Sequence, residues 1–132
     1  MSRQELLLLL KNSKATGSFV ASIDGKEFLH SEQFLFHNAG EEFFIIGSNN
    51  NEDWVVFSVP TSLEGGPHTV KYPFGTLEWD VLKDNDKYPI KSGSVTVTFD
   101  KNKTAVSGDV NFIVKNDAGG AKKVTGKFEI NQ

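Results

Sequence analysis

The sequence predicts an all-β fold, an antiparallel β-sandwich or flattened barrel of about nine or ten strands with a short N-terminal helix. Three observations predict it. Apolar and polar residues alternate in three runs within the last forty residues, which is typical of strands with one buried and one solvated face. Turn-forming pairs such as Asp24-Gly25 separate apolar runs. The chain has eleven Phe against two Trp and two Tyr, and Phe fills a sandwich interior without needing a hydrogen-bond partner.

The N-terminal helix is predicted over about Arg3 to Asn12. Ser2 and Glu5 have the spacing of a capping box, in which each side chain binds the backbone N–H of the other residue. The run from Leu6 to Leu10 is too short to span a membrane, and it is apolar around more than half of the helix. It therefore predicts a helix that caps an open end of the sandwich, or one that pairs with the same helix of another chain. We expect a monomer, or a dimer through this helix.

The chain is expected to form a single domain, 1–132, in which residues 1–16 are the helix and a connector. Predicted strands alternate in polarity and are separated by residues that favour turns. The predicted strands are 17–23, 26–36, 43–46, 54–59, 68–72, 76–82, 94–99, 106–115 and 123–130. The run 43–46 is apolar at every position, which predicts a central strand. Residues 83–92 are expected to form a charged loop.

Composition and charge narrow the classes of partner. The formal net charge is −3 and the isoelectric point is about 5.6, with Lys and Arg scattered along the chain. We expect no nucleic-acid binding, because nothing on such a surface attracts a phosphate backbone. The chain has no Cys, which excludes disulfides and thiolate metal sites. A cytoplasmic protein is expected, or a periplasmic one from which a leader has been removed.

Segments near both ends of the chain resemble a known group of proteins. These segments read A-S-I-D-G-K from Ala21, G-S-V-T-V-T from Gly93, S-G-D-V-N-F from Ser107 and V-T-G-K-F from Val124. Together they resemble small bacterial β-sandwich domains of unknown function, often attached to lipoproteins. The resemblance leaves about residues 40 to 90 unmatched, and this chain has no lipobox Cys. It implies a β-sandwich and offers no catalytic residues to carry over.

Candidate metal and carboxylate sites are few. His30 and Glu32 lie two residues apart on a predicted strand, which would place them on one face as part of a metal site. The chain lacks H-x-H and H-E-x-x-H motifs, so we predict separate histidines, and no metal or cofactor. The acidic loops from Asn49 to Asp53 and from Asp84 to Asp86 lack the EF-hand order, and we interpret them as solvated turns.

Two further sets of residues are candidates for binding or catalysis. Glu78 and Asp80 are predicted to share a strand face about 7 Å apart, a separation usable in glycoside hydrolysis. Aromatic and polar residues near strand ends are the candidates for a ligand site. These candidates are Trp54, His68, Tyr72, Phe74 and Tyr88.

The function predicted from these observations is a non-enzymatic binding or interaction module for a protein or small-molecule ligand. The sequence supplies a scaffold and no assembled set of catalytic residues. One alternative is a lipocalin-like barrel that holds a small apolar ligand. A more distant alternative is a glycan-acting enzyme that uses Glu78 and Asp80. A large internal cavity would favour the barrel, and a filled core would favour the interaction module.

Overall fold

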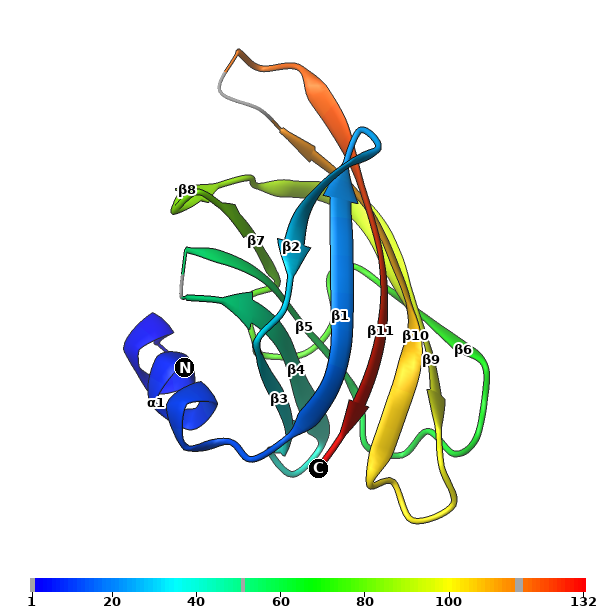
Figure 1. The fold of residues 1–132 in the computed structure, drawn as a ribbon. Coiled ribbons are helices and arrows are strands. Elements are labelled where there is room, and N and C mark those ends of the chain that lie inside the picture. The colour runs from blue at the N-terminus through cyan, green and yellow to red at the C-terminus, as the bar shows by residue number, and fades with distance from the viewer. Residues whose placement is uncertain (1, 51, 116–117) are drawn as a thin grey trace.

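The structure is a computed structural model that describes residues 2–50, 52–115 and 118–132. Within these residues two antiparallel sheets pack as a sandwich rather than a closed barrel, which confirms the predicted fold class (Figure 1). The helix found in the described residues is α1 (Arg3–Asn12), with the bounds that the sequence predicts. The strands are β1 (Thr16–Ile23), β2 (Lys26–His30), β3 (Gln33–Asn38), β4 (Glu42–Asn49), β5 (Asp53–Pro60), β6 (His68–Lys71), β7 (Asp80–Lys83), β8 (Asp86–Lys87), β9 (Ile90–Phe99), β10 (Ala105–Lys115) and β11 (Ala121–Asn131).

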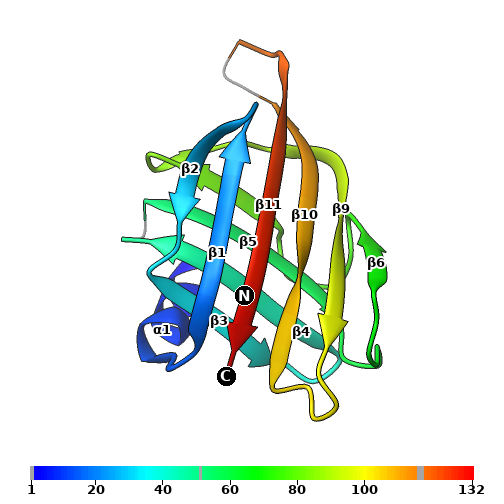
Figure 2. The ribbon, with the colours of Figure 1, turned by 45° about the vertical axis from the view of Figure 1, so that its right-hand side comes forward.

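The two sheets differ in size and direction. The six-stranded sheet has the order β2-β1-β11-β10-β9-β6, and the five-stranded sheet has the order β3-β4-β5-β7-β8. In Figure 2 the first sheet lies in front with its strands upright, and β3, β4 and β5 run across behind it. The chain passes between the sheets after β2, β5, β6 and β8. These crossings hold the sheets together at several corners of the sandwich.

The three strands at the carboxyl end confirm the predicted alternation. The apolar residues on their inward face are buried, and the polar residues between them are exposed or half-buried. β10 pairs with β11 from Ala105 opposite Asn131 to Lys115 opposite Ala121. The predicted turn at Asp24-Gly25 is also present, with positive φ angles of 48° and 82°. The residues from Asn116 to Gly120 also favour a turn by their sequence, and of these Asn116 and Asp117 lie outside the described residues.

The single strand predicted over 26–36 is wrong. The chain forms β2 in one sheet and β3 in the other, and the break lies at Ser31 and Glu32. The Ser31 N–H donates to the Phe19 carbonyl of the six-stranded sheet, and the Glu32 N–H donates to the Ser48 carbonyl of the five-stranded sheet. Consecutive amide groups therefore bind different sheets, which explains why polar residues interrupt the apolar pattern here.

The strand predicted over 76–82 is shorter than expected, because β7 begins at Asp80. Residues 74–79 instead cross from one sheet to the other. The indole Nε1 of Trp79 donates to the Ser58 hydroxyl at 3.2 Å and to the Phe74 carbonyl at 3.1 Å. The predicted loop over 83–92 contains β8 and the first residues of β9. The hydrogen bonds that hold Trp79 in this crossing leave no periodic pattern in the sequence.

The space between the sheets is filled by aromatic and aliphatic side chains. Most of the eleven Phe residues are buried, as the composition predicts. Phe19, Phe57 and Phe128 form a closed set of ring contacts with centroids 5.2 to 6.3 Å apart. Phe36, Phe43 and Phe99 form a second such set, at 4.8 to 6.2 Å. These distances are typical of close aromatic packing, so the main core is solid at the described positions.

Candidate functional site

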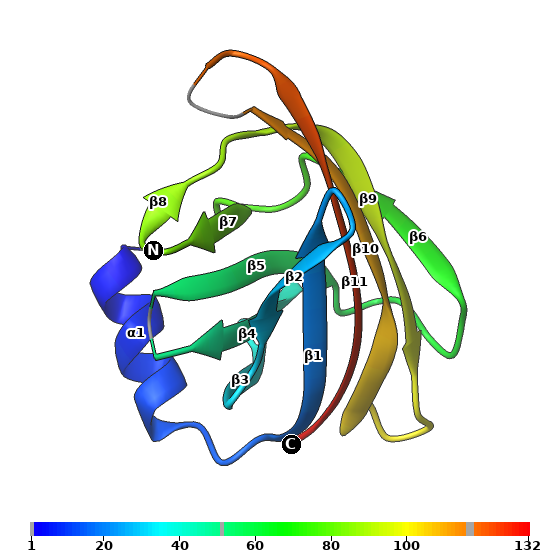
Figure 3. The same ribbon diagram turned by 45° about the horizontal axis from the view of Figure 1, so that its top comes forward.

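Helix α1 lies on the outer face of the five-stranded sheet, not over an open end of the sandwich as the first of the two sequence predictions had it (Figures 1 and 3). Leu6 and Leu10 are buried against this face, with exposed fractions of 5% and 3%. The sheet residues in the same cluster are Leu35, Phe44, Ile46, Trp54, Val56, Leu77 and Leu82. β4 is apolar on both faces, so its outer face needs a cover, and α1 provides it.

Local interactions fix the start of α1. Ser2 is the N-cap, its hydroxyl accepts a hydrogen bond from the Glu5 N–H at 3.2 Å, and the Glu5 carboxylate accepts one from the Ser2 N–H at 3.2 Å. This is the predicted capping box. These hydrogen bonds lower the pKa of Glu5 below its ordinary value. The Arg3 guanidinium adds a contact to the sheet, with its central carbon 5.2 Å from the Trp54 ring centroid.

The opposite side of α1 is exposed. Leu8 has an exposed fraction of 61% and is the one exposed large apolar side chain among the described residues. Its neighbours on this face, one helical turn away on either side, are the exposed residues Gln4, Glu5, Lys11 and Asn12. Buried, half-buried and exposed leucines thus lie around one short helix. A protein surface tolerates single apolar residues, so the surroundings of Leu8 decide whether its exposure matters.

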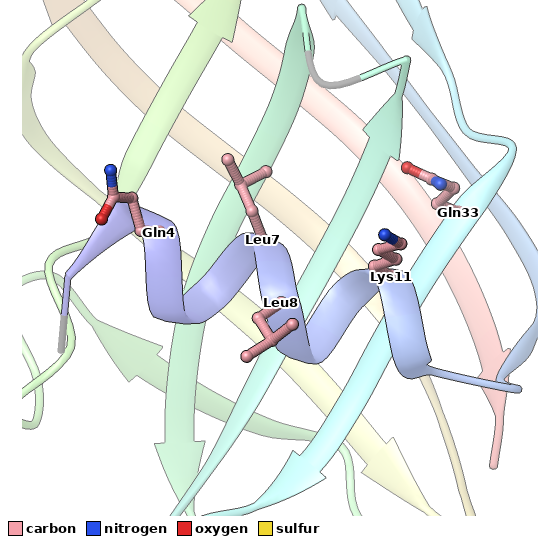
Figure 4. A pocket seen from close by; sticks show the side chains of 5 residues that line it. All are labelled: Gln4, Leu7, Leu8, Lys11 and Gln33. Carbon is pink, nitrogen blue, oxygen red and sulfur yellow. The ribbon is translucent and has the colours of Figure 1, made fainter.

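A groove of about 580 Å³ borders Leu8, between α1 and the start of β3. Gln4, Leu7, Leu8, Lys11 and Gln33 line it. In Figure 4 the side chains of Gln4, Leu7 and Lys11 lie on the same side of the helix as Gln33, and Leu8 projects on the other side. The groove therefore has leucine walls, amide groups and one ammonium group. Such a surface can hold an apolar side chain and bind a polar or anionic group next to it.

Two polar atoms near this groove have no hydrogen-bond partner among the described residues. They are the Gln33 Oε1 atom and the Ser48 hydroxyl, and Ser48 is fully buried. Gln33, Ser48 and Trp54 are register partners on β3, β4 and β5, so they form one row on the outer face of the sheet. Buried polar atoms without partners are costly. The row is a polar strip at one side of an otherwise apolar helix–sheet contact.

A second polar set lies on the other flank of α1. The Trp54 Nε1 atom donates to Asp80 Oδ2 at 3.2 Å, and Asp80 Oδ1 is buried without a hydrogen-bond partner among the described residues. Burial raises the pKa of Asp80, although the Lys87 ammonium and the Trp54 hydrogen bond oppose this effect. Glu78 accepts a short hydrogen bond from Lys87, and this bond raises the pKa of Lys87. Asp80 is therefore the acid here whose proton is held more tightly than usual.

The geometry around Glu78 and Asp80 gives the glycan-acting alternative no substrate cleft. Both residues line a hollow of about 50 Å³ that also includes Arg3, Leu6 and Trp54. Ligand sites for drug-sized molecules commonly have volumes of about 300–1,000 Å³, so this hollow has space for a water molecule or two. Glu78 is exposed and lies before β7 begins, not on a strand face with Asp80 as predicted.

The five residues predicted to form a ligand site do not lie together. They are Trp54, His68, Tyr72, Phe74 and Tyr88. Tyr72, Phe74 and Tyr88 are half-buried against the main core, and the Tyr72 ring packs on Trp79 with centroids 5.5 Å apart. Trp54 is buried on the other face of the five-stranded sheet, beneath α1. His68 is on edge strand β6, with Nε2 2.6 Å from the Glu64 carbonyl oxygen. Ligand binding by this set stays a prediction.

The residues considered for metal binding also lie apart from one another. His30 ends β2, and Glu32 lies in the crossing to β3, so the two do not share a strand. The acidic loops meet, because the Asp84 N–H donates to Asp53 Oδ1 at 2.8 Å. Asn51, within the first of these loops, lies outside the described residues. Among the residues that the structure describes, no three or more metal-binding side chains form a cluster.

Glu42 is a buried acid that the sequence analysis did not single out. Its carboxylate accepts hydrogen bonds from the Thr76 N–H and hydroxyl at 3.0 Å and from the Leu77 N–H at 3.4 Å. Burial alone would raise the pKa of Glu42, but the hydrogen bonds from Thr76, Ser58 and Leu77 outweigh it and lower the pKa. Glu42 thereby anchors the segment that places Leu77 under α1. The sequence does contain a signal that could have identified Glu42, because it is a charged residue at the start of the apolar strand β4.

Comparison with protein-family models, with characterised proteins and with solved structures finds no match to this chain. The resemblance of its ends to bacterial sandwich domains therefore stays a prediction. No helix in the described ranges is long and apolar enough to span a membrane. What is known of the groove beside α1 is therefore its lining residues and its volume.

Proposed function

We propose that this protein is a non-enzymatic interaction module whose contact surface is the exposed side of α1 with the adjoining groove. The observation that carries the proposal is Leu8, 61% exposed on a helix that is otherwise fixed in place by its capping box and by two buried leucines. Apolar side chains on an exposed helix face are a known mode of protein recognition, in which they enter a groove of the partner. We place the protein in the cytoplasm, since a chain without Cys suits a reducing compartment.

The filled interior supports an interaction module over a barrel that encloses a ligand. Aromatic rings are in contact across the middle of the sandwich, and Phe19, Phe57 and Phe112 are fully buried. The groove beside α1 lies instead on the outer surface of the five-stranded sheet. A binding partner would therefore meet the protein at its surface. The lipocalin-like and glycan-acting alternatives have no specific observation in their favour.

Site-specific photo-crosslinking in cells that produce the protein tests this proposal. A photoreactive phenylalanine analogue would replace Leu8 in one variant and Lys101, an exposed residue of the β9–β10 turn, in the control. We expect a discrete adduct from position 8 and none from position 101. Equal labelling at both positions, or no adduct at position 8, would contradict the proposal.

A further inference from the structure

We propose that the partner of α1 is a second copy of this chain, bound through an antiparallel pair of α1 helices whose two-fold axis passes beside Leu8. This inference rests on the proposed function and names the partner for the same surface. In such a pair each helix uses the same residues, as the two-fold symmetry of most homodimers requires. The pairing follows from Leu8 and the four exposed residues around it.

The exposed face of α1 is symmetric in position about Leu8. Gln4 and Asn12 lie four residues on either side of Leu8, and Glu5 and Lys11 lie three residues on either side. A two-fold axis beside Leu8 places Leu8 against its own copy and brings the first turn of one helix level with the last turn of the other. Each exposed leucine would then be covered by the other, which removes the unfavourable contact of both with water.

The charges on this face favour the antiparallel direction. Glu5 is the acidic residue of the first turn, and Lys11 is the basic residue of the last turn. In a parallel pair, Glu5 would lie level with Glu5 of the partner and Lys11 level with Lys11, and like charges near one another are unfavourable. An antiparallel pair brings the acidic end of each helix next to the basic end of its partner. The helix dipoles are also opposed in that arrangement.

On the flank of α1 that borders the groove, the positions of the side chains determine which of them meet in the pair. Gln4 and Lys11 lie on the same side of α1, next to the groove (Figure 4). In the antiparallel pair, Lys11 of each copy therefore faces Gln4 of the other, and this contact occurs twice. The surface is small, since a standard stable interface uses about 20–30 residues from each partner. We expect a weak dimer that forms with increasing protein concentration.

Cysteine substitution provides a direct test, because the chain has no Cys of its own. A disulfide needs Cα atoms within about 7 Å, which the axis beside Leu8 provides for L8C. We expect L8C to form disulfide-linked dimers about tenfold faster than the exposed control K101C under mild oxidation, because paired thiols have a high effective concentration. K11C alone should not form disulfide-linked dimers rapidly, since its two copies would lie about 9 Å apart along the helix axis. A mixture of Q4C and K11C should cross-link, because these two positions face each other in the antiparallel pair.

Charge substitution at Gln4 tests the direction of the pair. In the antiparallel pair, Q4E places a carboxylate opposite Lys11 at two sites, and Q4K places an ammonium there. Sedimentation between about 10 µM and 1 mM covers the range of weak dissociation constants. We expect Q4E to tighten the dimer about two- to tenfold and Q4K to weaken it by a similar factor, as two exposed ion pairs would. N102E and N102K in the exposed β9–β10 turn are matched controls that should change nothing.

The outcomes separate this inference from the proposed function. A monomer at every concentration, with L8C no faster than K101C, overturns the dimer. If the position 8 photo-crosslink in cells still yields an adduct with another protein, the interaction module survives without the dimer. If neither test gives a product, both proposals fail. A dimer that Q4E does not tighten, or that Q4K does not weaken, overturns the antiparallel arrangement, because Lys11 of the partner would then not lie opposite Gln4.

Discussion

Replacement of Leu10 by Ala is expected to release α1 from the five-stranded sheet. Leu10 is 3% exposed within the cluster between helix and sheet, whereas Leu8 on the same helix is 61% exposed. A buried Leu→Ala substitution costs about 2–5 kcal/mol, and we expect about 2–3 kcal/mol here, because a helix at the surface can shift to fill part of the cavity. Leu8→Ala is the matched control and should lie within about 0.5 kcal/mol of the wild type. Ala is at least as good a helix former as Leu, so neither change weakens the helix itself.

Hydrogen exchange of the α1 amides is the direct measurement, made at low micromolar concentration so that any dimer is absent. Isolated helices shorter than about 12–15 residues are marginal in water, so a ten-residue helix that leaves the sheet also loses its hydrogen bonds. A loss of about 2 kcal/mol corresponds to about 30-fold faster exchange. Leu10→Ala should show this change, and Leu8→Ala should change exchange by about twofold at most. Equal effects of the two substitutions would refute the placement of α1 on this sheet.

The remaining predictions concern buried polar groups and close packing, and urea unfolding measures each of them. Glu42→Gln should cost about 1–3 kcal/mol near pH 7, because its hydrogen bonds from Thr76 are to a charged group. Since folding lowers the pKa of Glu42, this advantage of the wild type is lost as the pH falls through the folded pKa, and an unchanged difference in acid would contradict the assignment. Asp80 should behave oppositely: burial raises its pKa, so the wild type should gain stability relative to Asp80→Asn as the pH falls through the raised pKa of the folded state. Gly47→Ala should cost about 1–3 kcal/mol, because a Cβ atom there would lie 2.5 Å from Cγ of Phe19; a neutral substitution would show that this ring can move.

The alternation of apolar and polar residues was enough to predict β9, β10 and β11, because each buried residue there lies next to solvated neighbours on one continuous strand. The same pattern could not reveal the break at Ser31 and Glu32. There, successive amide groups bind different sheets, and a change of partner leaves the alternation of nearby side chains almost unaltered. The capping box of Ser2 and Glu5 was predictable because both partners lie within one turn of the helix.

The candidate site was only partly predictable. The run from Leu6 to Leu10 indicated a helix with two apolar sides, but the sequence did not determine which leucine would be buried. Gln33 had no signal at all, because its place in the groove depends on a helix more than twenty residues away along the chain. Trp54 was grouped with Tyr72 on their aromatic character, yet the two lie on opposite faces of the five-stranded sheet.

The sequence by itself determined the all-β class, the helix from Arg3 to Asn12 and the inward residues of the long strands. These features depend on neighbours along the chain, and periodicity and capping record such neighbours directly. Only the tertiary structure decided that α1 covers the five-stranded sheet, that Glu42 anchors Thr76 and that Leu8 is left exposed. Each of these depends on contacts between segments far apart in the sequence, where side-chain shape and available hydrogen-bond partners select one arrangement among several that suit the same pattern.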